Sequence, residues 1–188
     1  MAIRKPLTFL FICCLAGCVP SLHQFYTRQT LVYDPAIAGT WQQDDERWEF
    51  VGDPNTYAYA LTITDKNDKQ SKLIAHLVEI DEQRFFDFYP AADAEIEAGD
   101  WLKFHLVPVH LFFKVEKTEE GLSVAAMNPD AIQKLLAEKP EQVKHELVED
   151  DRVILTDTPQ NLQKFVIDGM KTEGFFGKPV ELRPVEQP

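Results

Sequence analysis

The chain has 188 residues, with 31 Asp or Glu against 19 Lys or Arg, and its formal net charge at pH 7 is −12. A surface of this sign repels phosphate groups, which argues against a nucleic-acid partner. The length is sufficient for one domain with its own hydrophobic core.

The start of the chain has the layout of a signal sequence. Arg4 and Lys5 precede an apolar stretch that ends in Leu15-Ala16-Gly17-Cys18. This stretch is too short to span a bilayer, which requires roughly 20 apolar residues. The segment resembles the lipobox of bacterial lipoproteins, in which a dedicated peptidase cuts between Gly17 and Cys18 once the cysteine carries diacylglycerol. Cys13 and Cys14 do not follow a small residue and do not fit that pattern.

The lipobox implies a signal peptide at residues 1–17 and a lipid anchor on Cys18. Two or three acyl chains are enough for stable attachment to a membrane. Because Val19 rather than Asp follows the cysteine, the periplasmic face of the outer membrane is the expected location. No disulfide is expected, since cleavage removes Cys13 and Cys14 and acylation occupies Cys18.

After the cysteine, residues 18–35 show no clear period and are interpreted as the lipidated cysteine and a tether. Several apolar side chains, including Phe25 and Tyr26, indicate that part of this segment packs on the domain. Residues 36–188 are expected to form a single β-rich globular domain.

The middle of the chain alternates apolar and polar residues with the period of two that is typical of strands. Pro90–Asp100 is a polar excursion with a helical turn expected within 92–98. Trp101–Glu116 is a long apolar run, read as two strands or as one strand broken at Pro108, because proline removes a donor from the ladder. The expected strands are Tyr57–Thr64, Lys72–Ile80, Arg84–Tyr89, those two around Pro108, and Leu122–Met127.

From Asn128 the period becomes helical. Asn128-Pro129-Asp130 is typical of a helix start, and this first helix is expected to end at Pro140. A pair of strands is expected after Pro140, at His145–Val148 and Arg152–Thr156, joined by an acidic turn at 149–151. The last strand expected is an edge strand at 180–183.

A second helix is predicted over Pro159–Met170. Leu162, Phe165, Val166 and Met170 form one apolar stripe along it. We expect this stripe to cover an aromatic patch on the sheet. The predicted fold is α+β and mostly β: an antiparallel meander or barrel-like curved sheet, with two C-terminal helices packed on it.

Gly39-Thr40-Trp41 at the start of the first strand resembles the Gly-x-Trp of the lipocalin (calycin) family. In that family the tryptophan closes the barrel floor and an arginine packs over it, a part that the resemblance gives to Arg183. A tryptophan with no role beyond the core is the alternative reading. Over residues 18–188 the chain is also similar to uncharacterised bacterial lipoproteins that share its lipobox and its Asp-Pro-x-x-x-Gly-Thr-Trp start, which implies a location but no activity.

Local catalytic and metal-binding motifs are missing from the sequence. His76, His105, His110 and His145 are better explained as isolated polar side chains than as ligands, because a metal site needs three or four converging groups. No nucleophile elbow, phosphate loop or dinucleotide fingerprint is found. We therefore expect no catalytic residue, no metal and no cofactor.

The expected location in the cell envelope is the main guide to the function. The first hypothesis is a cell-envelope lipoprotein acting as a non-enzymatic binding or assembly module, with a hydrophobic or lipid ligand or an envelope protein as its partner. The 13 Phe, 5 Tyr and 3 Trp place large rings on both faces of strands. Cover by the helices is the preferred interpretation of these rings, and an apolar pocket for a lipid or another hydrophobic envelope component is the alternative. The alternative is a periplasmic hydrolase with a carboxylate pair, which leaves no local motif. The ligand-binding residues are not predicted.

Overall fold

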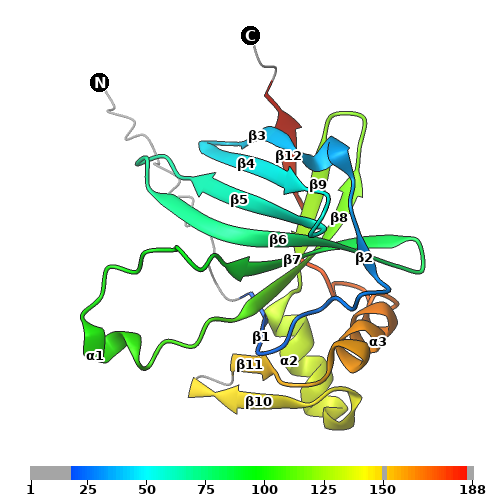
Figure 1. Cartoon of the computed structure of the whole chain (residues 1–188). Coiled ribbons are helices and arrows are strands. Elements are labelled where there is room, and N and C mark those ends of the chain that lie inside the picture. Colours follow the sequence, from blue (N-terminus) through cyan, green and yellow to red (C-terminus); the bar gives the residue numbers. More distant parts are fainter. Residues whose placement is uncertain (1–17, 150–151, 186–188) are drawn as a thin grey trace, which may run out of the picture.

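Eight antiparallel strands close into a barrel in the computed structural model, which describes residues 18–149 and 152–185 (Figure 1). The expected signal peptide, including Gly17 of the cleavage site, lies outside the described residues. Each strand pairs with the next, and the last pairs with both β9 and β3. The strands are β3 (Gly39–Gln43), β4 (Glu46–Asp53), β5 (Ala58–Thr64), β6 (Gln70–Ile80), β7 (Gln83–Pro90), β8 (His110–Lys117), β9 (Leu122–Ala126) and β12 (Val180–Pro184).

The last strand is where the prediction of an edge strand was wrong. Val180 of β12 pairs with Val124 of β9, and Arg183 pairs with Gln42 of β3. Leu182 is fully buried inside the barrel. The C-terminal strand therefore joins the two edges of the meander, which removes the unpaired edges that an open sheet would expose.

The remaining elements lie outside this barrel. Figure 1 shows α2, α3, β10 and β11 gathered below it, with β1 linking β11 to β8. Both long helices are capped by a side chain. Asn128 accepts from the amides of Asp130 and Ala131, as its position at the predicted helix start implies, and Thr158 accepts from the amide of Asn161. These elements are β1 (Pro20–Ser21), β2 (Leu31–Val32), η1 (Pro35–Ile37), α1 (Asp100–Lys103), α2 (Pro129–Glu138), η2 (Pro140–Gln142), β10 (His145–Val148), β11 (Arg152–Leu155) and α3 (Pro159–Gly169).

The strands of the barrel separate two hydrophobic cores. Alternation along β7 sends Phe86 and Phe88 inward and Phe85 outward, so large rings occupy both faces as the pattern predicted. The inner core also holds Trp41, Trp48, Phe50, Tyr59 and Leu61. The outer core joins Phe85 and Phe112 to Ile132 of α2 and to Leu162, Phe165 and Val166 of α3. The prediction that the second helix covers an aromatic patch is therefore confirmed.

The segment before η1 belongs to this outer core. Val19 and Phe25 are buried, and the Phe25 ring packs 5.3 Å from that of Phe85. The Phe25 carbonyl accepts a 2.7 Å hydrogen bond from Nε2 of Gln163 on α3. As expected, part of the segment between Cys18 and the barrel packs on the domain, with Val19 and Phe25 buried and Leu22 exposed.

One long connection differs from its prediction. No strand forms before Pro108 in the run from Trp101, and the helical turn falls at Asp100–Lys103 instead of within 92–98. The first residues of β8 already pair with β7 on one side and β1 on the other. No edge is left there for another strand, and Pro108 would supply no donor.

Candidate functional site

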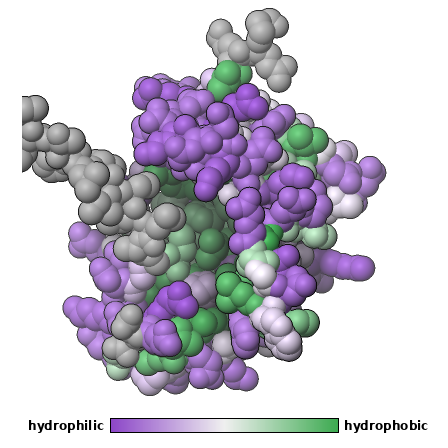
Figure 2. Space-filling model, turned by 90° about the vertical axis from the view of Figure 1, so that its left-hand side faces the viewer, coloured by the Kyte–Doolittle hydropathy of each residue, from purple (hydrophilic) through white to green (hydrophobic). Residues whose placement is uncertain are grey.

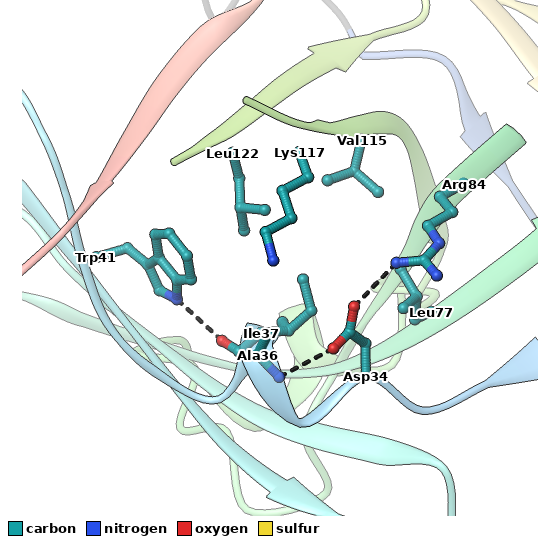
Figure 3. A pocket seen from close by; sticks show the side chains of 9 residues that line it. All are labelled: Asp34, Ala36, Ile37, Trp41, Leu77, Arg84, Val115, Lys117 and Leu122. Atoms are coloured by element: carbon teal, nitrogen blue, oxygen red, sulfur yellow. Dashed lines mark hydrogen bonds and ion pairs between the residues drawn. The ribbon is translucent and has the colours of Figure 1, made fainter. Parts of the chain in front are cut away.

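One end of the barrel is closed. There η1 lies across the opening, and Nε1 of Trp41 donates a 2.9 Å hydrogen bond to the Ile37 carbonyl (Figure 3). A cavity of about 30 Å³ remains beside them, enough for one or two water molecules and too small for an organic ligand. The tryptophan of the Gly-x-Trp pattern thus sits in the floor of a barrel, as in the family it resembles.

The charges around this floor come from residues other than the one the resemblance suggested. Arg84 bonds Asp34 at 2.9 Å and Glu79 at 2.8 Å, and Figure 3 shows Lys117 pointing into the same cavity. A hydrogen bond from the Ala36 amide, together with Arg84, lowers the pKa of Asp34. Arg183 instead reaches out to Glu120 at 3.4 Å with its side chain 69% exposed, so the assignment of Arg183 to the floor was wrong.

Tyr59 fastens the floor to the barrel wall. Its hydroxyl donates to the Asp34 carbonyl at 3.0 Å and accepts from the Asp34 amide at 2.8 Å. Burial raises the pKa of this hydroxyl to about 12. Tyr59 therefore stays protonated at physiological pH, and its role at this end is structural.

The opposite end of the barrel is apolar and open. β5 and β7 run toward it, on the left-hand side of Figure 1, and Figure 2 shows on that side a hollow coloured as hydrophobic. Trp48 and Phe88 point inward near this end with ring centroids 6.0 Å apart, and Phe113 lies 4.8 Å from Phe88. Ile63, Leu73 and Phe113 are only partly buried, so apolar surface of the inner core is accessible from this side.

A long apolar loop starts at the same end. The connection between β7 and β8, residues 91–109, carries α1, and its Trp101 and Phe104 side chains are 85% and 82% exposed. Its other exposed large hydrophobic residues are Ile96, Leu102, Leu106 and Val107. Exposed apolar groups this dense are uncommon on a monomeric surface and mark a binding site for a protein, a membrane or a ligand.

The sequence did not predict one buried carboxylate, that of Asp87, which lies on the outer face of the barrel. Asp87 is fully buried, accepts from the Phe25 amide at 2.7 Å and lies 2.7 Å from Nδ1 of His110. A carboxylate only accepts, so Nδ1 of His110 donates. The ring of Tyr89 stacks on that of His110 at 4.3 Å. A single Asp inside the run Phe85–Tyr89 was the signal available in the sequence.

The four histidines considered as ligands are spread over the structure. His76 is opposite Asp87 in the β6–β7 register, with its ring 4.2 Å from that of Tyr26 in a tilted arrangement. His110 contacts the Asp87 carboxylate. His105 lies exposed in the apolar loop, and His145 bonds the Val143 carbonyl. Within residues 18–149 and 152–185, no three His, Cys, Asp or Glu side chains form a group that could hold a metal ion.

The buried carboxylates do not form a catalytic pair. Among the described residues only Asp87 and Asp157 are buried acids, and they have no partner in common. Burial alone would raise the pKa of Asp157, but hydrogen bonds from the Lys144 amide, Asn161 and the Thr158 amide outweigh it and lower that pKa. Its role is to hold the start of α3.

The comparisons with known proteins add no relative. No protein-family model matches the chain, and no curated sequence or solved structure is significantly similar to it. The closed barrel of eight antiparallel strands fits a calycin-like fold. In the part of the chain that the structure describes, none of the helices has the length and apolar character needed to cross a bilayer.

Proposed function

We propose that this protein is a cell-envelope lipoprotein, attached through Cys18 at the periplasmic face of the outer membrane, that binds a hydrophobic ligand without catalysis. The observation that carries the proposal is the open end of the barrel, an apolar hollow in Figure 2, where Ile63, Leu73 and Phe113 are only partly buried and an exposed apolar loop begins. Binding sites for apolar ligands are concave and lined by such side chains.

The contrast between the two ends of the barrel supports this choice. Residues Pro35–Ile37 cap one end, and the space of about 30 Å³ left there is too small for an organic ligand. At the other end, Ile63 and Leu73 keep part of their apolar surface uncovered. Covering that surface with a hydrophobic molecule is favourable by about 25 cal/mol for each Å² removed from water.

A carboxylate hydrolase is the weaker candidate. A carboxylate pair for glycoside chemistry must face one substrate across about 5–10 Å. The two buried acids described above, Asp87 and Asp157, each bind amide groups of the backbone that they stabilise. Because the two carboxylates bind separate parts of the backbone, they do not face one common substrate site.

Ligand binding is tested with an uncharged fluorescent apolar probe, N-phenyl-1-naphthylamine. The purified chain should enhance the probe's emission, and Leu73→Arg, which puts a charge at the open end, should weaken binding by about tenfold or more. Val51→Arg is the matched control, because Val51 is 60% exposed on the barrel surface. Circular dichroism checks that both variants fold. Equal binding by the two variants would contradict a site at the open end.

The anchor is tested separately by labelling cells with radioactive palmitate. Cys18→Ala should abolish the label and release the chain from membranes, because Cys18 is the cysteine that fits the lipobox. A variant that is still labelled and still sediments with membranes would show that Cys18 is not the anchor.

A further inference from the structure

We propose that residues 101–107, the apolar second half of the loop between β7 and β8, insert into the surface of the lipid bilayer beside Cys18. This insertion holds the open end of the barrel toward the membrane. This inference rests on the anchor of the proposed function. It does not depend on whether the barrel binds a ligand.

The first support is the short distance along the chain between Cys18 and the folded body. Cys18 is exposed, yet the next residue, Val19, is buried in the outer core. An acylated Cys18 therefore has almost no free chain between the lipid and the folded body. The surface around Cys18 must then touch the bilayer, so the groups exposed on that side decide how the body lies.

The second support is where the chain places the loop. Two residues after Cys18, Pro20 and Ser21 pair with Leu111 and His110, the first two residues of β8. The loop ends directly before His110. The anchor and the end of the loop are thus joined through one short ladder, and Figure 1 shows the loop projecting from the barrel on the side of its open end.

The third support is the division of the loop into two halves. The first half is acidic and is held against β6, since the Ala91 amide donates to the Lys72 carbonyl at 3.1 Å and Asp93 pairs with the Lys72 ammonium at 2.9 Å. The second half projects and reads Trp101-Leu102-Lys103-Phe104-His105-Leu106-Val107.

The composition of this projecting half suits a bilayer surface. Tryptophan is enriched at the level of the lipid headgroups, and a lysine can extend its charged end to water while its aliphatic part stays in the apolar layer. The rings of Trp101 and Phe104 lie 6.2 Å apart on one short turn of helix. The acidic residues of the loop are confined to its first half, where they can remain in water.

The test uses the acylated full chain reconstituted in phosphatidylcholine vesicles. Phe104→Cys provides a thiol for a nitrobenzoxadiazole label, and Tyr57→Cys is the matched control, because Tyr57 is also exposed but lies in the β4–β5 turn at the closed end. The label at 104 should shift to the blue and be quenched by spin-labelled lipid. The label at 57 should do neither.

Two outcomes would overturn the inference. A label at 104 that stays in water while the protein still floats with the vesicles means that the loop does not insert. Quenching at both positions means that the body has no fixed orientation. Loss of flotation and of palmitate labelling would instead mark a failure of the anchor, which is read independently from Cys18→Ala.

A second experiment measures how much the loop contributes to membrane binding in a chain that has no acyl anchor. In the mature chain carrying Cys18→Ala, the double substitution Trp101→Ser and Phe104→Ser should lower partitioning into the same vesicles by about a hundredfold, because two large apolar side chains no longer enter the lipid. Both residues are more than four-fifths exposed, so the fold should tolerate the change. Equal partitioning with and without the two side chains, or its replacement by self-association, would refute bilayer insertion.

Discussion

Replacing Asp87 with alanine tests the joint between the N-terminal segment and the barrel. Asp87 is fully buried and holds the Phe25 amide and Nδ1 of His110, each at 2.7 Å. Each buried donor left without an acceptor costs about 1–3 kcal/mol. The two donors together predict a loss of about 2–6 kcal/mol. This is a large part of the 5–15 kcal/mol that stabilises a typical domain.

Urea unfolding followed by tryptophan fluorescence measures this loss as a lower midpoint at an unchanged slope. Asp93→Ala is the control, because Asp93 has a partner at a similar distance, Lys72 at 2.9 Å, but its side chain is 72% exposed. Its midpoint should not move, since exposed ion pairs contribute little. If Asp87→Ala and Asp93→Ala behave alike, burial does not set the strength of these contacts and the reasoning fails.

Further predictions concern packing and pH. Phe165→Ala should cost about 3–5 kcal/mol, because Phe165 is buried with its ring 5.5 Å from that of Phe175; an unchanged melting temperature would contradict this packing. Burial lowers the pKa of His76 below its ordinary 6.5, against the opposing pull of Asp87. As the pH falls, His76 is therefore protonated in the unfolded chain at a higher pH than in the folded one. The contribution of His76 to the free energy of unfolding should be complete above about pH 6.5 and should decline as the pH falls below that value. His76→Gln should flatten this part of the profile in urea midpoints measured from pH 8 to pH 5.

Much of the fold was predictable because its signals are local. The two-residue period predicted strands over 57–64 and 72–80, and the structure has β5 and β6 there within two residues at each end. Asn128 caps its helix as predicted. The second helix was placed correctly because its apolar stripe requires a covered face. These features depend on neighbours within a few residues, so the sequence alone contains them.

The errors arose where distant segments decide the structure. Val180–Pro184 alternates like any edge strand, and only its pairing with both β3 and β9 makes it the closing strand. The run from Trp101 to Val107 is as apolar as a strand, yet the pairing of β8 with β7 and β1 leaves it no partner. Arg183 was assigned by resemblance, whereas the strand register points Arg84 and Lys117 at the floor.

The misread loop is also the most informative part of the candidate site. The apolar run from Trp101 to Val107 contributes no strand to the barrel, so its apolar character does not stabilise the isolated protein. The cost of exposing Trp101 and Phe104 to water must be offset by a contact outside the chain. Under the proposed anchor at Cys18, the burial of Val19 would hold the folded body close to the bilayer, and the proposed insertion of the loop would supply such a contact. The exposed loop and the short connection between Cys18 and the folded body therefore both support the proposed position of this protein directly on a membrane.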